Sequence, residues 1–101
     1  MYCAYYNCSM KDLKFEWDED KERANIKKHG ISFSTAALVF NDEQRVEYYD
    51  ADHSGEEDRF VTIGLVGDII TVVYTIRKPV YRIISARPAT QIEKKRYYDG
   101  Y

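Results

Sequence analysis

Residues 59–86 read RFVTIGLVGDIITVVYTIRKPVYRIISA, and their pattern is the strongest indication of the fold. It contains three strand-like runs, at 59–66, 69–76 and 80–86, that hold most of the β-branched residues of the chain. The pair Gly67-Asp68 is typical of a two-residue hairpin, and Lys78-Pro79 predicts a second turn. We therefore expect these three strands to lie next to one another and to carry the hydrophobic core.

The segments before this stretch predict a strand, two helices and another strand. Residues 14–17 alternate as a short strand, and Asp18 is suited to cap a helix over 19–29. That helix has an acidic first turn, a basic last turn and a closing Gly30, which all complement its dipole. A second helix is expected after Ser32, with an apolar stripe at Phe33, Ala36, Ala37 and Phe40.

The remaining segments complete a single domain. A strand is expected over 45–50 and an acidic loop over 51–58, while Pro88 ends the sheet and Thr90-Gln-Ile-Glu93 is a capping box that opens a last helix. The predicted order is β-α-α-β-β-β-β-α, an α+β fold with a small, mainly antiparallel sheet and helices packed against it. We place this one domain at 14–101 and expect 1–13 to be a poorly ordered N-terminal extension.

The charge of the chain is unevenly distributed. Its 15 Lys and Arg residues nearly balance 17 Asp and Glu residues, and the net charge of −2 argues against a general nucleic-acid coat. Segment 41–58 nevertheless carries a charge of −7, and segment 77–96 a charge of +6. These blocks either neutralise each other in the fold or create separate surface fields.

Cysteine content and hydropathy indicate the compartment. Cys3 and Cys8 both lie in the first nine residues, so thiols can build neither a disulfide framework nor a zinc site in the body of the domain. No apolar stretch reaches the length of a membrane helix, and the first residues lack the pattern of a secretory signal. We therefore expect a cytoplasmic protein that does not contact a membrane.

One histidine stands out in the acidic loop. His53 lies near Asp50, Asp52 and Glu56, but the spacing of these residues matches no established metal motif, so no metal or cofactor is predicted. A loop imidazole titrates near neutral pH and can act as a general acid or base, and the alternative interpretation is a solvated loop side chain. The second histidine, His29, is explained by the C-terminal end of a helix.

Arginines supply the other candidate chemistry. Arg82 lies within an apolar strand, so it either points to the open face of the sheet or pairs with a carboxylate. Arg82 and Arg87 would form an anion clamp on one face, but their opposite parity in the strand means that this requires a β-bulge or a twist. Guanidinium, imidazole, carboxylate and phenol groups together suit metal-free RNA cleavage, without being specific for it.

The ordered set of motifs along residues 14–98 resembles the BrnT family of toxins. Single pieces are weak, but their order is specific. The first half of the match contains Phe15-Glu16-Trp17-Asp18, Lys21, Asn25, Lys28-His29-Gly30, Phe33 and residues 36–40. The second half contains Asp52-His53-Ser54, Glu57, Arg59-Phe60, Ile63-Gly64, residues 72–75 and 82–87, Ala89-Thr90, Glu93 and Tyr97. Residues 1–9, the Tyr-rich tail 97–101 and Asp58 depart from the pattern.

This resemblance implies a RelE-like ribonuclease that arrests translation. It also implies RNA as substrate and a BrnA-like antitoxin with a ribbon-helix-helix part, through which alone operator DNA would be bound. The positions that match the polar motifs of the family are His53, Glu57, Arg59, Tyr74, Arg82 and Arg87. Among them we expect the three arginines to hold phosphate, Glu57 or His53 to act as base, and Tyr74 or His53 to act as acid.

Two further interpretations stay open at this point. The chain could be a non-catalytic module that uses its basic C-terminal region to hold RNA or an acidic segment of a protein partner. It could also be a toxin that has lost its activity and is retained for complex formation and autoregulation.

Overall fold

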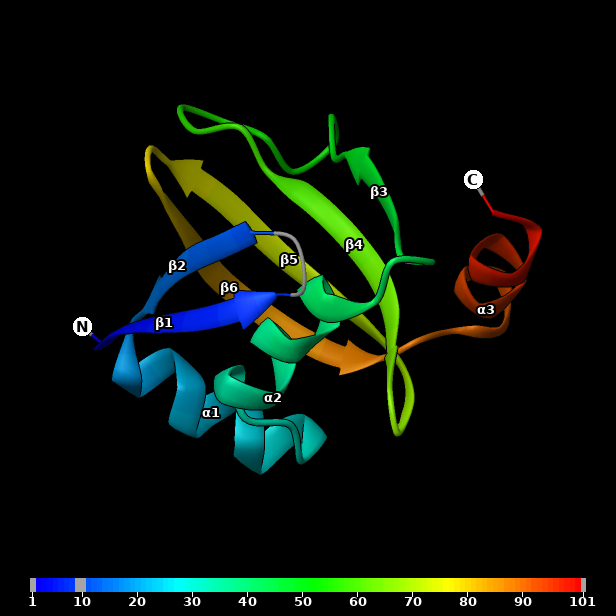
Figure 1. Cartoon of the computed structure of the whole chain (residues 1–101), viewed down its shortest axis with the longest axis horizontal. Helices are drawn as coiled ribbons and strands as arrows, with labels where there is room; N and C mark the ends of the chain where they lie inside the picture. The colour runs from blue at the N-terminus through cyan, green and yellow to red at the C-terminus, as the bar shows by residue number, and fades with distance from the viewer. Residues whose placement is uncertain (1, 9–10, 101) are drawn as a thin grey trace.

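One mixed sheet organises the chain, whose computed structural model describes residues 2–8 and 11–100 (Figure 1). Over these residues six strands lie in the order β1-β2-β6-β5-β4-β3. Strands β2 and β6 pair in parallel, and all other neighbours pair antiparallel. The strands are β1 (Tyr2–Cys8), β2 (Lys11–Trp17), β3 (Val46–Tyr49), β4 (Phe60–Val66), β5 (Asp68–Arg77) and β6 (Val80–Pro88).

The helices lie on different sides of this sheet. Helix α1 (Glu19–His29), helix α2 (Phe33–Ala37) and the 3-10 helix η1 (Leu38–Asn41) cover one face, which we call the first face (Figure 1). Helix α3 (Gln91–Asp99) packs against the opposite, second face at the β4 end. The α+β class and the predicted order from β2 to α3 are therefore confirmed, whereas the division of the chain at residue 13 stays a prediction.

Local sequence signals set the ends of the helices. The Asp18 side chain accepts hydrogen bonds from the backbone N–H groups of Asp20 and Lys21, and Gly30 ends α1 at a φ of 72° in the left-handed region. The Thr90 hydroxyl and the Glu93 carboxylate form the predicted capping box of α3. The second helix differs from the prediction, because its last residues tighten into η1.

The main core lies between the first face and the helices. The Phe40 ring occupies its centre, with ring centroids 5.1 Å from Phe15, 5.1 Å from Tyr74 and 5.5 Å from Tyr81. The buried Asn25 side chain ties α1 to β6, since it donates to the Ala86 carbonyl at 2.8 Å and accepts from the Ala86 N–H at 3.1 Å. This anchor fixes α1 beside the end of β6 where Arg87 follows.

A register shift in β6 changes which side chains share a face. Ile83 lies opposite Tyr74 and Ser85 lies opposite Val73, so Ile84 is an extra, bulged residue. Beyond the bulge Arg87 lies opposite Thr71, while Arg82 lies opposite Thr75. Thr71 and Thr75 are four residues apart in β5, so both arginines project from the second face.

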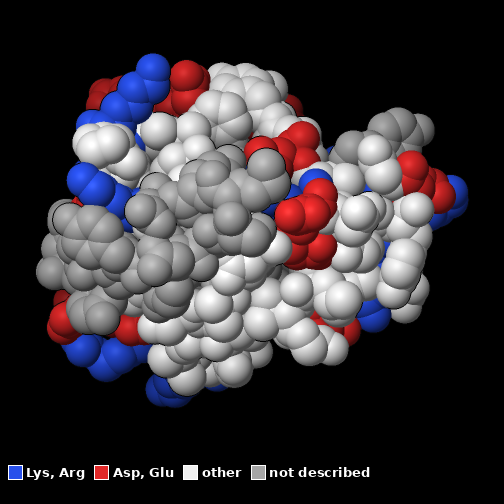
Figure 2. All heavy atoms as spheres, viewed as in Figure 1, with Lys and Arg blue, Asp and Glu red and all other residues white. Residues whose placement is uncertain are grey.

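Charged side chains of both signs meet at the surface. Figure 2 shows acidic and basic residues next to each other around the rim of the face that carries α1 and α2. The ion pair between Arg77 and Glu57 joins the basic block of the sequence to the acidic block. The two blocks therefore neutralise each other in part.

Candidate active site

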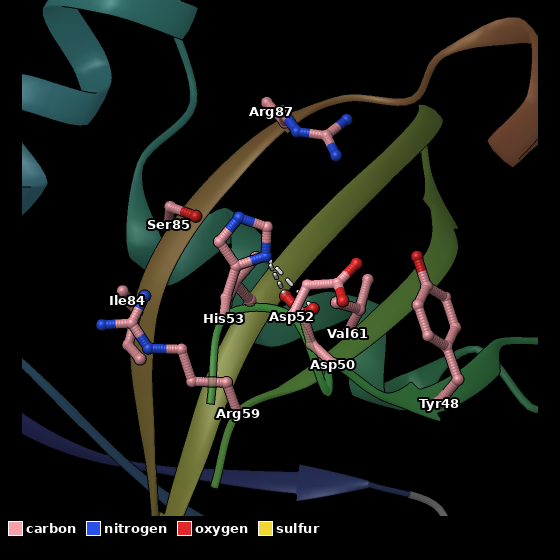
Figure 3. Close-up of a pocket in the computed structure, with 10 residues that line it drawn as sticks. Tyr48, Asp50, Asp52, His53, Arg59, Val61, Ile84, Ser85 and Arg87 are labelled. Atoms are coloured by element: carbon pink, nitrogen blue, oxygen red, sulfur yellow. Dashed lines mark hydrogen bonds and ion pairs between the residues drawn. The ribbon is translucent and has the colours of Figure 1, made fainter. Parts of the chain in front are cut away.

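The second face carries a hollow of about 560 Å³, which we call the first hollow (Figure 3). Strands β3 to β6 and the loop over residues 50–59 supply its walls. Side chains of the second face provide apolar floor, and titratable groups surround it. Its lining consists of Tyr48, Asp50, Asp52, His53, Arg59, Val61, Val73, Ile84, Ser85 and Arg87.

An imidazole–carboxylate pair lies at the mouth of this hollow. Nδ1 of His53 is 3.0 Å from Oδ2 of Asp50, and the other ring nitrogen points away from Asp50 (Figure 3). The His53 side chain is 71% exposed and that of Asp50 only 19%. When Nδ1 donates its proton to Asp50, Nε2 is left as an acceptor that substrate can reach. This is the arrangement of a general base with an orienting carboxylate.

Hydrogen bonds within the loop hold this pair in place. The Ser54 hydroxyl donates to the Asp50 carbonyl at 2.7 Å and accepts from the Arg59 N–H at 2.9 Å. The Asp50 N–H in turn donates to the Arg59 carbonyl at 2.9 Å. The loop is therefore closed across its base, which keeps His53 beside the start of β4.

Arg87 faces the same hollow and is held by α3. Its two terminal nitrogens contact the two oxygens of Glu93 at 2.6 and 2.8 Å, a bidentate ion pair. Burial alone would raise the pKa of Glu93, but hydrogen bonds from Arg87 and from the Thr90 N–H outweigh it and lower the pKa to about 2. The guanidinium therefore has a fixed orientation while its side chain stays 38% exposed.

Arg59, the last loop residue before β4, supplies a second guanidinium. Its side chain is half-buried, and among the described residues it forms no ion pair. With Arg87 it brackets His53 in the lining of the first hollow. Two arginines and an imidazole around one open hollow suit an anionic substrate.

Glu57 lies in a neighbouring, second hollow of about 590 Å³, lined by His53, Gly55, Glu56, Glu57, Arg59 and Arg77. Its carboxylate accepts from Nε of Arg77 at 2.7 Å and from Nη2 at 3.1 Å. The hydrogen bonds from Arg77 lower the pKa of Glu57. A carboxylate held in this way is a weaker proton acceptor, which makes Glu57 a poorer base than His53.

Arg82 lies on the second face but lines neither hollow. Its Nη1 is 2.7 Å from Oε2 of Glu16, and both side chains are largely buried, at 12% and 13% exposure. The sequence left two possibilities for Arg82, projection from the sheet face and pairing with a carboxylate. In the structure both occur together. Arg82 thereby joins β2 to β6.

Tyr74 does not join the other candidates, which corrects the sequence-based expectation. Its ring is 3% exposed and lies on the first face, in contact with Phe40, Phe60 and Tyr81. Burial raises its pKa, which disfavours loss of its proton. Alternation in β5 contained the signal, since Tyr74 shares its parity with the core residues Ile70 and Val72.

Sequence reasoning missed two polar residues of the first hollow, Tyr48 and Ser85. Tyr48 packs beneath the guanidinium of Arg96, 4.5 Å from its ring centroid. Tyr48 could have been found from its alternation with the buried Val46 in a half-buried strand. Ser85 could not, because the bulge at Ile84 determines which way it points.

Within residues 2–8 and 11–100, no three His, Cys, Asp or Glu side chains form a group able to hold a metal ion. No helix of this described part has the length and apolar composition required to cross a membrane.

Comparison with known proteins places the chain among the ribonuclease toxins of type II toxin–antitoxin systems. The family model described as "Ribonuclease toxin, BrnT, of type II toxin-antitoxin system" matches residues 17–93, which include every candidate site residue. The chain therefore belongs to the BrnT family, as the sequence resemblance predicted. Membership of a toxin–antitoxin family implies an antitoxin partner.

A solved structure agrees with this assignment. The 1.1 Å crystal structure of the Brucella abortus ribonuclease toxin BrnT has a TM-score of 0.58 and 28% sequence identity. The match covers 76% of this chain and 96% of that chain. No curated protein matches the chain.

Proposed function

We propose that this protein is a RelE-like, metal-independent endoribonuclease that inhibits translation in the cytoplasm by cleaving RNA. A BrnA-like ribbon-helix-helix antitoxin would neutralise it and would provide the only contact with operator DNA. The observation that carries the proposal is the His53–Asp50 pair, which lines an open hollow together with Arg59 and Arg87. Ribonuclease activity in the family supports RNA as the substrate.

His53 acts as the base in this proposal. Its Nε2 takes the proton of the 2′-hydroxyl, the 2′-oxygen attacks the adjacent phosphorus, and the bond from phosphorus to the 5′-oxygen breaks. The products are a 2′,3′-cyclic phosphate and a 5′-hydroxyl end. Asp50 orients the imidazole and stabilises the imidazolium that forms, because it lies 3.0 Å from Nδ1.

The arginines take different parts. Arg59 and Arg87 bind the phosphate and stabilise the charge that develops on its oxygens in the transition state. Glu93 keeps the Arg87 guanidinium in one orientation, which lowers the entropy lost when phosphate binds. Arg82 supports the site indirectly, through its ion pair with Glu16.

Tyr48 replaces Tyr74 as the phenol that donates a proton to the leaving 5′-oxygen, because Tyr48 lines the first hollow. We expect Tyr48→Phe to lower the cleavage rate by about 10-fold or more, since general acid catalysis contributes about 10²–10⁴-fold. Tyr74→Phe is the matched control and should keep near wild-type cleavage, because its hydroxyl lies on the other face. Single-turnover rates of both variants test the assignment, and equal rates would contradict it.

The function itself is tested by incubating the purified protein with RNA in EDTA. We expect new RNA ends that carry 2′,3′-cyclic phosphate, detected by mass spectrometry, at a rate that chelation leaves unchanged. Loss of cleavage in EDTA would point to a metal site instead. RNA binding without cleavage would favour the non-catalytic module, and growth without arrest when the chain is expressed alone would favour a toxin that has lost its activity.

A further inference from the structure

The second hollow lies next to the proposed reaction centre. His53 and Arg59 line both hollows, so an RNA strand that crosses His53 passes from one hollow into the other. At about 590 Å³ the second hollow falls in the size range of small-molecule sites. It has room for one nucleotide beyond the scissile phosphate.

Two guanidinium groups of this hollow, those of Arg59 and Arg77, can bind an anion, and the carboxylates of Glu56 and Glu57 lie beside them. The Glu57 carboxylate is hydrogen-bonded by Arg77, and Arg82 and Arg59 also lower its pKa through their charges. Three guanidinium groups therefore act on one carboxylate. Arg77 holds that carboxylate through Nε and Nη2, the fork geometry with which arginine also binds phosphate.

The carboxylate is replaceable by a ligand. The Arg77 and Glu57 side chains are 47% and 45% exposed, and exposed ion pairs contribute little to stability because water screens them. Glu57 also sits in a loop over residues 50–59 rather than in a strand, so it can move aside without disturbing the sheet.

We propose that the second hollow binds the nucleotide adjacent to the cleavage point of single-stranded RNA, whose phosphate takes the place of the Glu57 carboxylate on Arg77. This inference rests on the proposed function for the identity of the ligand. Glu57 then serves as an internal anion that occupies the phosphate position in the free protein, and it has no part in proton transfer.

Binding measurements test this subsite separately from catalysis. The ligands are a dinucleotide and a tetranucleotide of 2′-O-methyl RNA, which lack the attacking hydroxyl, and fluorescence anisotropy gives the dissociation constants. We expect wild-type protein to bind the tetranucleotide about 10-fold more tightly than the dinucleotide, since a charge-assisted hydrogen bond has about this effect. Arg77→Ala should abolish most of this difference and reduce the slope of log K against log salt by about 0.7.

Two further variants complete the test. Lys27→Ala removes an exposed positive charge from α1 on the first face. It should leave unchanged both the affinity difference between tetranucleotide and dinucleotide and the slope of log K against log salt. Glu57→Gln should tighten tetranucleotide binding a few-fold, because it removes the competing charge. The proposal would be overturned if Arg77→Ala kept both the wild-type ratio of tetranucleotide to dinucleotide affinity and the wild-type salt dependence. Weaker tetranucleotide binding by Glu57→Gln would also overturn it. So would binding of an acidic peptide, but of no tetranucleotide, in the second hollow. Intact tetranucleotide binding without cleavage of unmodified RNA would instead refute the ribonuclease function and leave the subsite standing.

Discussion

Replacement of His53 by alanine is expected to lower the rate of RNA cleavage by about 10²–10⁴-fold, the usual contribution of a general base. The physical reason is that no other group in the first hollow combines an accessible acceptor nitrogen with an orienting carboxylate. The Glu57 carboxylate cannot substitute, because Arg77 lowers its pKa. Single-turnover cleavage of a labelled RNA at saturating protein measures the chemical step.

The chain offers a matched control for this substitution. His29, at the C-terminal end of α1, is the other histidine, and His29→Ala should leave the chemical step unchanged. Asp50→Asn should have an intermediate effect, since it keeps the shape of the orienting group and loses its charge. Wild-type cleavage by a folded His53→Ala protein would remove the imidazole from the mechanism.

The fold was predictable wherever short segments determine it. Asp18 and Gly30 set the two ends of α1 through contacts within one helical turn. Gly67 takes the positive φ that the hairpin turn requires. The division of the second helical segment into α2 and η1 was not predictable, because it depends on how Val39 and Phe40 pack against the sheet. The position of β2 beside β6 also depends on contacts between distant parts of the chain.

The candidate site shows the same division between local and distant causes. His53, Arg59 and Arg87 were named from the sequence and lie around one hollow. Arg87 points to the second face because of the bulge at Ile84. The sequence pattern showed that Arg82 and Arg87 need a bulge or twist to share a face, but not where it lies. Tyr74 was wrongly placed in the site because it was chosen from the family motif alone. Its alternation with the core residues of β5, which puts it on the buried face, was not considered.

The link between α3 and the site is itself not local. Glu93 has two partners, since its carboxylate caps the helix at Thr90 and also holds the Arg87 guanidinium on the second face. Any change that removes the charge of Glu93 therefore weakens the helix cap and frees the arginine at once. The stability of the fold and the geometry of the site should consequently respond to the same titration.

Acidification is expected to destabilise the protein through Glu93. Its pKa is about 2 in the folded chain against an ordinary 4.5, so the stabilisation is fully present above about pH 4.5 and is lost as the pH falls toward 2. At 1.36 kcal/mol for each pKa unit, the loss amounts to at most about 3 kcal/mol. Urea unfolding at pH 6 and at pH 2.5 measures it, and Glu93→Gln should be less stable than wild type at pH 6 with a smaller loss on acidification.

Other groups must be separated from this effect. Asp42 also has a lowered pKa, because hydrogen bonds from Tyr97 and from the Leu65 and Gln44 N–H groups outweigh its desolvation, so the difference between wild type and Glu93→Gln is the quantity that isolates Glu93. Asp99→Asn breaks the exposed pair with Lys95 on the same helix and should leave the free energy of unfolding at pH 6 almost unchanged, because water screens this pair. If Glu93→Gln unfolded with the same pH dependence as wild type, the Arg87–Glu93 pair would contribute nothing to acid sensitivity. Because Glu93 also holds Arg87, the variant should lose cleavage activity at pH 6 even where it remains fully folded.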